Sequence, residues 1–129
     1  PIPGASAFAS LVSVAGAGGK TLVFEGFLSP KPGRRRSRLK ELMAMEAAVV
    51  LYESPFRITK LLADIADIDS ERRVVVGREL TKLHEEIVEG TAQNLLEDFA
   101  SRSKIQGEFA VFISKSSKNT KDFDEDADN

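Results

Sequence analysis

The sequence has 129 residues, enough for one compact domain, and its 42% hydrophobic and 29% charged residues are ordinary for a globular protein. It contains no cysteine and one histidine, which excludes disulfides, cysteine nucleophiles and metal sites built on cysteine or several histidines. The net charge of −2 does not by itself indicate a nucleic-acid partner. No apolar stretch has the length of a membrane span, and the first residues lack the pattern of a signal peptide.

The first half of the chain predicts an alternation of helices and strands. Residues 5–15 carry apolar side chains at helical spacing and are followed by three glycines, so a helix is expected there. The short apolar run 21–24 predicts a buried strand, and a basic cluster after it opens a second helix whose arginines are expected to face solvent or a partner. Residues 47–52 are apolar throughout, which predicts a strand covered on both faces. Ser54-Pro55 then predicts the capped start of a helix.

The second half predicts three more strands and one more helix. Strands are expected at 73–77 and 86–89, with an irregular polar segment between them. Thr91 is expected to cap a helix, and the apolar run 109–113 predicts the last strand.

The order α-β-α-β-α-β-β-α-β predicts an α/β domain over residues 1–113, in which a mixed sheet of about five strands is flanked by about four helices. Residues 114–129 are polar, and five of the last eight are acidic, so this tail is expected to be disordered. The charge of an acidic tail can offset that of a basic region in the net charge of the chain. Such a region exists here, because five basic residues fall between Lys31 and Arg38.

Four polar segments lie where the predicted strands end or the predicted helices begin, which is where α/β sheets bind ligands. They are Pro3-Gly4-Ala5-Ser6-Ala7, Tyr52-Glu53-Ser54-Pro55-Phe56-Arg57, the segment Arg78–Glu86, and Gly107-Glu108-Phe109. Each also has a plainer interpretation: a helix cap, a capped helix with an incidental Glu, a connecting loop held by surface ion pairs, and a simple turn. Composition and spacing alone therefore lead to an α/β domain with a candidate polar ligand site.

Two of these features suggest a particular ligand chemistry. Tyr52 could pack on an adenine, and Glu53 could accept hydrogen bonds from a ribose hydroxyl or an amino group. The arginine cluster suits phosphate contacts because guanidinium groups match phosphate oxygens in pairs, although a solvated helix face is the alternative. Its members are Arg34, Arg35, Arg36 and Arg38.

The four segments, together with Phe24-Glu25-Gly26-Phe27-Leu28, resemble in sequence and order the bacterial 16S ribosomal RNA cytidine 2′-O-methyltransferases of the tetrapyrrole (corrin/porphyrin) methylase superfamily. The resemblance covers residues 1–113, and its most specific parts are Tyr-Glu-Ser-Pro from Tyr52 and Glu-Leu-Thr-Lys-Leu-His-Glu from Glu79. Ala5 stands where that family often has proline, and the acidic tail matches nothing in it.

The resemblance implies a homodimeric two-domain enzyme of which this chain is the C-terminal half. S-adenosylmethionine would sit between this half and an N-terminal domain. The positions that would face this cofactor are Pro3, Gly4, Ser6, Ala7, Tyr52, Glu53, Ser54, Glu79, Thr81, Gly107 and Glu108. The arginine cluster would lie toward the RNA, and no metal is implied.

A ribose 2′-hydroxyl is a weak acid, so methyl transfer to it benefits from a general base or a positioned charge. The resemblance does not single out that group. The candidates in the third segment are Glu79, Lys82, His84 and Glu85.

The expected partners are 16S ribosomal RNA or the small ribosomal subunit, in the cytoplasm and away from membranes. Without the N-terminal domain, the isolated half is expected to fold but not to catalyse methyl transfer. Three alternatives stay open: a corrin or porphyrin methyltransferase domain, a non-catalytic module for RNA binding or dimerisation, and an acidic-tailed interaction domain with no small-molecule site.

Overall fold

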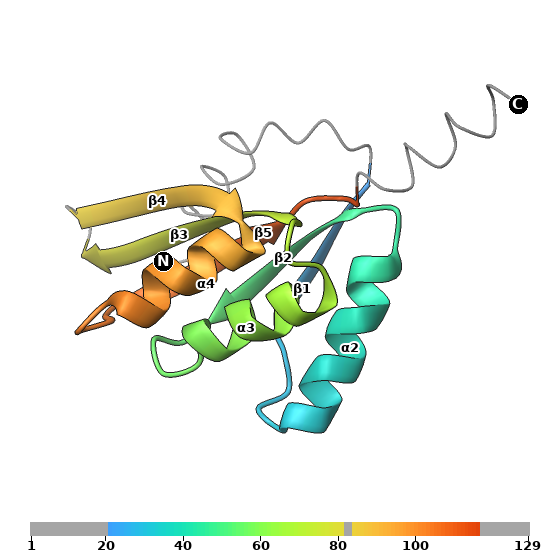
Figure 1. Ribbon diagram of the computed structural model, residues 1–129, viewed down its shortest axis with the longest axis horizontal. Coiled ribbons are helices and arrows are strands. Elements are labelled where there is room, and N and C mark those ends of the chain that lie inside the picture. Colours follow the sequence, from blue (N-terminus) through green and yellow to red (C-terminus); the bar gives the residue numbers. More distant parts are fainter. Residues whose placement is uncertain (1–20, 82–83, 117–129) are drawn as a thin grey trace, which may run out of the picture.

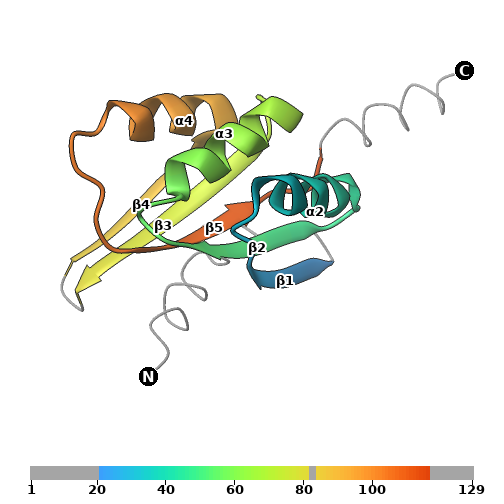
Figure 2. The ribbon, with the colours of Figure 1, turned by 90° about the horizontal axis from the view of Figure 1, so that it is seen from below.

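A computed structural model describes residues 21–81 and 84–116. Within these ranges five strands form one sheet, and three helices pack together on one of its faces (Figures 1 and 2). The elements are β1 (Leu22–Phe27), α2 (Pro32–Ala44), β2 (Ala48–Glu53), α3 (Ile58–Ile68), β3 (Arg73–Thr81), β4 (His84–Thr91), α4 (Ala92–Ser101) and β5 (Glu108–Ile113). This confirms the α/β class and the predicted order of elements from residue 21 onward. The expected helix over 5–15 lies outside the described residues.

The sheet is mixed, as predicted, and its strand order is β1-β2-β5-β3-β4. β1 and β2 are parallel, whereas β5 runs antiparallel to both of its neighbours and β4 runs antiparallel to β3. Consequently β1, β2 and β3 all point the same way. Their carboxyl ends meet the amino ends of β4 and β5 at one end of the sheet, which we call the site end.

The core follows from the alternation of side chains along the strands. In β2, Val49 and Leu51 point toward the helices, while Ala48 and Val50 point to the other face, and all four are buried. The expectation of a strand covered on both faces is therefore confirmed. On the helix side the main cluster joins these strand residues to apolar side chains of all three helices. The helix residues are Leu39, Leu42, Met43, Ile58, Leu61, Leu62, Ile65, Ala66, Ala92, Leu95 and Phe99.

Helices α3 and α4 begin with different hydrogen-bonding patterns. Thr91 caps α4 as predicted, since its hydroxyl accepts a hydrogen bond from the backbone N–H of Asn94 at 3.1 Å. The prediction that Ser54 caps α3 is wrong. The Ser54 carbonyl instead accepts the N–H of Arg57 at 3.1 Å and that of Ile58 at 3.0 Å, so residues 54–57 form a turn and α3 begins at Ile58. Proline suits the second position of such a turn, which Pro55 occupies.

The segment expected to be irregular, between Arg78 and Glu86, is mostly strand. β3 continues to Thr81 and β4 begins at His84, and the two pair as one hairpin. The register sets Arg78 opposite Glu86, and their side chains form an ion pair. Opposite charges across a ladder stabilise it, so a run that is polar in sequence can still form strand.

Gly26 produces an irregularity in the edge strand β1. The register with β2 shifts between Phe24 and Gly26, and Gly26 has a φ of 78°, a left-handed conformation that only glycine adopts without cost. The Glu25 carboxylate in this bulge accepts two hydrogen bonds from the Arg38 guanidinium of α2, at 2.8 and 2.9 Å. This paired contact ties the edge strand to the helix layer.

Arg72 joins three elements at the end of the sheet opposite the site end. Its side chain is 7% exposed and donates to the Asp69 carboxylate at 3.0 Å, to the Met43 carbonyl at 3.2 Å and to the Ser114 carbonyl at 3.3 Å. These contacts connect the end of α2, the turn before β3 and the end of β5. A buried guanidinium is tolerated here because each of its three nitrogens donates to an acceptor.

We expect Arg72→Ala to lower the free energy of unfolding by about 2–4 kcal/mol, because it leaves a carboxylate and two carbonyls without their donor. Urea denaturation measures the change. The matched control is Arg73→Ala next to it, which removes an exposed ion pair with Glu89 and should change stability by less than about 1 kcal/mol. Equal effects of the two substitutions would contradict the structural role of Arg72.

The contact between Glu25 and Arg38 also predicts a pH dependence. The hydrogen bonds from the guanidinium lower the pKa of Glu25 below its ordinary value of 4.5, against a smaller opposing effect of burial. A carboxylate whose pKa is lower when folded adds stability above pH 4.5 and loses it as the pH falls through the folded pKa. Glu25→Gln should therefore destabilise the chain near neutral pH, and its deficit relative to the unsubstituted chain should shrink below pH 4.5. Denaturation at several pH values tests this, and a deficit independent of pH would refute it. The control, Glu97→Gln, removes an exposed carboxylate of α4.

Candidate functional site

The topology brings together three polar segments that are far apart in the sequence. At the site end, Glu53 of β2 pairs with Phe109 of β5, and Phe109 pairs in turn with Arg78 of β3. One step further along, Glu79 pairs with Glu108. The Tyr-Glu-Ser-Pro segment, the start of the long charged segment and the Gly-Glu-Phe segment thus lie side by side.

Tyr52 and Glu53 point to opposite faces of the sheet because they are successive residues of one strand. The Tyr52 ring is half-buried on the face away from the helices, where its centroid lies 5.3 Å from that of Phe24 and 5.6 Å from that of Phe27. Glu53 lies on the helix side. A single small ligand group on one face of the sheet therefore cannot contact both side chains.

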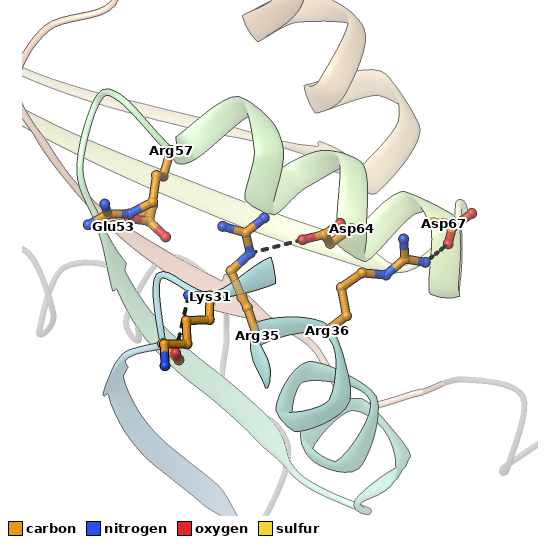
Figure 3. Close-up of polar contacts among 8 residues, drawn as sticks. Lys31, Arg35, Arg36, Glu53, Arg57, Asp64 and Asp67 are labelled. Atoms are coloured by element: carbon orange, nitrogen blue, oxygen red, sulfur yellow. Dashed lines mark hydrogen bonds and ion pairs between the residues drawn. The ribbon is translucent and has the colours of Figure 1, made fainter. Parts of the chain in front are cut away.

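Glu53 is a buried carboxylate, 4% exposed, at the carboxyl end of β2. Its Oε1 accepts the Ser54 backbone N–H at 2.8 Å and the Arg57 Nε–H at 3.2 Å, and the side chains of Glu53 and Arg57 lie together in Figure 3. Both donors come from the turn that replaces the expected helix start. Within the described ranges these bonds reach Oε1 alone, so Oε2 keeps its capacity to accept a hydrogen bond from a ligand.

The Ser54 hydroxyl is buried and has no hydrogen-bond partner among the described residues. Such groups are rare because an unsatisfied buried hydroxyl costs about 1–3 kcal/mol. It follows Glu53 directly, so a free acceptor and an unpaired hydroxyl occur together at the site end. These two groups fit a ligand that carries hydroxyl and amino groups.

The hairpin of β3 and β4 brings the candidate catalytic residues to the same end of the sheet. Thr81 pairs with His84, and Glu79 pairs with Glu85, with a register irregularity between Glu79 and Thr81. Their backbone positions, at the carboxyl end of β3 and the amino end of β4, place them near the segment at Glu108. Lys82 lies outside the described residues, as do Pro3, Gly4, Ser6 and Ala7.

A charge cluster that the sequence did not reveal holds the hairpin against α4. Glu86 Oε1 accepts from Arg102 Nη1 at 2.9 Å and lies 3.4 Å from Arg78 Nε. Arg102 also pairs with Asp98, which raises the pKa of the guanidinium, and its charge lies 4.1 Å from the Phe99 ring centroid. The i,i+4 spacing of Asp98 and Arg102 was a signal in the sequence, but the link to Glu86 depends on the fold.

Gly107 has a φ of 93°, a conformation in which other residues are strained. It turns the chain into β5, and Glu108 follows it with an exposed side chain. The backbone conformation at this position therefore requires glycine, which supports the interpretation of this segment as a turn.

The arginine cluster is divided between internal contacts and solvent. Arg35 is 5% exposed and pairs with Asp64 of α3 at 3.0 Å, and Arg36 pairs with Asp67 one turn further on (Figure 3). The expectation that the arginines face solvent or a partner is wrong for Arg35, because it lies four residues before Leu39 on the buried face of α2. Arg38 is bound to Glu25 and Glu41. Arg34 is exposed and has no ion-pair partner in the described part of the chain.

The described residues contain no group of three or more side chains placed to hold a metal ion. None of their helices combines the length and the apolar character needed to cross a membrane.

Known proteins resemble this chain in sequence over most of its length. Residues 1–96 match the family described as Tetrapyrrole (Corrin/Porphyrin) Methylases. A Borrelia garinii subsp. bavariensis protein named Ribosomal RNA small subunit methyltransferase I is 40% identical over 118 residues, which are 91% of this chain and 53% of that protein. A Thermotoga maritima protein of the same name is 39% identical over 113 residues, covering 88% and 50%. The chain thus spans about half the length of these curated relatives.

Solved structures support the same fold. A cobalt precorrin-4 methyltransferase aligns with a TM-score of 0.59 and 17% identity, covering 84% of this chain and 48% of that one. The methyltransferase CobJ aligns with a TM-score of 0.61 and 15% identity, covering 85% and 48%. Because the family match covers most of the chain and the relatives agree with it, the chain belongs to the tetrapyrrole methylase family.

Proposed function

We propose that this chain is the C-terminal half of an S-adenosylmethionine-dependent methyltransferase that modifies a cytidine ribose 2′-oxygen in 16S ribosomal RNA. The observation that carries the proposal is the identity of about 40% to proteins named Ribosomal RNA small subunit methyltransferase I over nine-tenths of the chain. In this proposal residues 1–113 form the domain, a preceding domain completes the cofactor site, and the enzyme works as a homodimer in the cytoplasm.

Glu53 and Ser54 support the cofactor part of the proposal. S-adenosylmethionine supplies an electrophilic methyl group when bound, and it carries ribose hydroxyls and amino groups. The free oxygen of the Glu53 carboxylate would accept hydrogen bonds from such groups, and the unpaired Ser54 hydroxyl would gain a partner. Arg57 and the Ser54 N–H hold the carboxylate in one orientation. Tyr52, on the other face, would contact a different part of the cofactor or the second domain.

The remaining proposed contacts are distributed along the site end. Glu79, Thr81, Gly107 and Glu108 would line the same cofactor site, with Pro3, Gly4, Ser6 and Ala7 contributing from the start of the chain. One of Lys82, His84 and Glu85 would take the proton from the ribose hydroxyl. Arg34, Arg36 and Arg38 would face the RNA, whereas Arg35 is bound within the fold and would support α2.

A corrin or porphyrin substrate is the second candidate, since two such methyltransferase structures share the fold. At 15–17% identity they support only the architecture. The higher identity to the ribosomal RNA enzymes favours RNA.

The decisive experiment compares this chain with a protein in which the N-terminal domain is restored. We expect the longer protein to bind S-adenosylmethionine by calorimetry and to transfer a labelled methyl group to small ribosomal subunits lacking the modification. The chain alone should bind the cofactor at least about tenfold more weakly, since part of the site is missing. Methyl transfer to a tetrapyrrole and not to RNA would replace the proposed substrate, and turnover by the chain alone would refute the two-domain site.

Ser54→Ala in the longer protein separates binding from stability. Because the hydroxyl has no hydrogen-bond partner among the described residues, its removal should leave the free energy of unfolding unchanged or raise it by up to about 1 kcal/mol. The same substitution should weaken cofactor binding by about fivefold or more, because it removes one hydrogen bond to the ligand. Calorimetry and urea denaturation give the two quantities. The control is Ser37→Ala on the exposed face of α2, which should leave both unchanged. Unchanged cofactor affinity in Ser54→Ala would exclude Ser54 from the site.

A further inference from the structure

Phe56 is an exposed aromatic side chain at the site end. It is 89% exposed, more than any other large hydrophobic residue in the described part of the chain. It belongs to the turn between β2 and α3, three residues after the buried Glu53 and next to Arg57. Because that turn is fixed by the hydrogen bonds of Ser54 with Arg57 and Ile58, the ring projects from a defined position.

Exposed cations lie at the same end of the sheet as Phe56. Both α2 and α3 begin at the site end, because each follows the carboxyl end of a parallel strand (Figures 1 and 3). Neither helix has an acidic residue in its first turn. Lys31 and Arg34 at the start of α2 and Lys60 at the start of α3 are exposed and have no ion-pair partner among the described residues. Arg57 is half-exposed, although one of its nitrogens is bound to Glu53.

The acids of α3 do not neutralise the two helix starts, and the nearby Glu53 is bound to Arg57. Asp64 and Asp67 lie further along α3, where they are bound to Arg35 and Arg36 (Figure 3). These ion pairs use Arg35 and Arg36, and they leave Lys31, Arg34 and Lys60 without an ion-pair partner among the described residues. An exposed ring that shares one end of the sheet with cations that have no ion-pair partner among the described residues matches a ligand with flat apolar rings and regularly spaced negative charges.

Single-stranded RNA has this chemistry. Its unpaired bases stack on aromatic side chains, while lysine and arginine contact the phosphates on either side. We propose that Phe56 stacks on an unpaired base of RNA, and that Lys31, Arg34 and Lys60 contact the neighbouring phosphates. The proposal rests on the proposed function for the identity of the RNA, but it assigns the contact to the turn before α3 and to the two helix starts.

The test uses the 129-residue chain and a single-stranded RNA oligonucleotide that contains 2-aminopurine, whose fluorescence is quenched when it stacks. We expect Phe56→Ala to bind about 5-fold to 100-fold more weakly and to lose the quenching, with an unchanged salt dependence. Phe56→Tyr should keep both, because its ring still stacks. The matched control is Phe27→Ala, which removes a 66% exposed ring on the other face of the sheet and should bind like the unsubstituted chain.

The phosphate contacts have a separate readout. Lys60→Gln should reduce the slope of log affinity against log salt by about 0.7, since one phosphate contact is lost, and should leave the quenching in place. The control is Lys115→Gln, an exposed lysine beyond β5 at the opposite end of the sheet, which should leave the slope unchanged.

Unchanged affinity in Phe56→Ala, equal binding of a duplex of the same sequence, or no RNA binding by the chain would each overturn this proposal. These outcomes are distinct from a failure of the proposed function. If the longer protein methylates ribosomal RNA and Phe56→Ala leaves RNA affinity unchanged, only the stacking contact is refuted. RNA binding that depends on Phe56, in a longer protein that transfers no methyl group, would refute only the methyltransferase.

Discussion

The antiparallel placement of β5 between β2 and β3 is the constraint on which the site depends. β5 is the last element of the fold, yet it forms ladders with two strands that precede it by a long stretch of chain. Because both neighbours run against it, they run parallel to each other, and their carboxyl ends meet at one end of the sheet. Without β5 the segments at Glu53 and Glu79 would belong to two separate sheets, and the polar groups of the site end would not share one surface.

The site end is also where the fold leaves polar groups incompletely satisfied. Elsewhere in the described ranges the buried charges are paired: Arg72 donates to three acceptors, and Arg35 forms an ion pair with Asp64. At the end of β2, by contrast, a buried carboxylate has bonds to one oxygen only, and a buried hydroxyl has none within the described ranges. Proteins tolerate this cost at positions where a ligand completes the hydrogen bonds. The two groups at the end of β2 together therefore indicate a ligand site more strongly than either does alone.

Much of this arrangement could be predicted from sequence, for identifiable reasons. The apolar runs at Val49 and Val75 indicated buried strands, and Thr91 indicated a helix start, because these signals are local. Arg35 could also have been predicted, since it lies four residues before Leu39 on the apolar face, but its partner Asp64 depends on how α2 meets α3. Both strands of the hairpin were predicted, but the segment between Arg78 and Glu86 was expected to be irregular, because the pairing of these two residues becomes visible only once the register is known. The start of α3 was placed too early because Ser-Pro is compatible with both a helix cap and a turn.

The bulge at Gly26 has a consequence for how copies of this protein can associate. An edge strand with a regular row of free N–H and C=O groups is a template for another strand, and proteins commonly interrupt such edges to prevent aggregation. In β1 the register shift and the ionised Glu25, held by Arg38, interrupt the row. Extension of the sheet from one copy to the next across β1 is therefore disfavoured. Any dimer that uses this edge must depend on side chains such as the exposed ring of Phe27, and its stability should follow apolar burial more than backbone pairing.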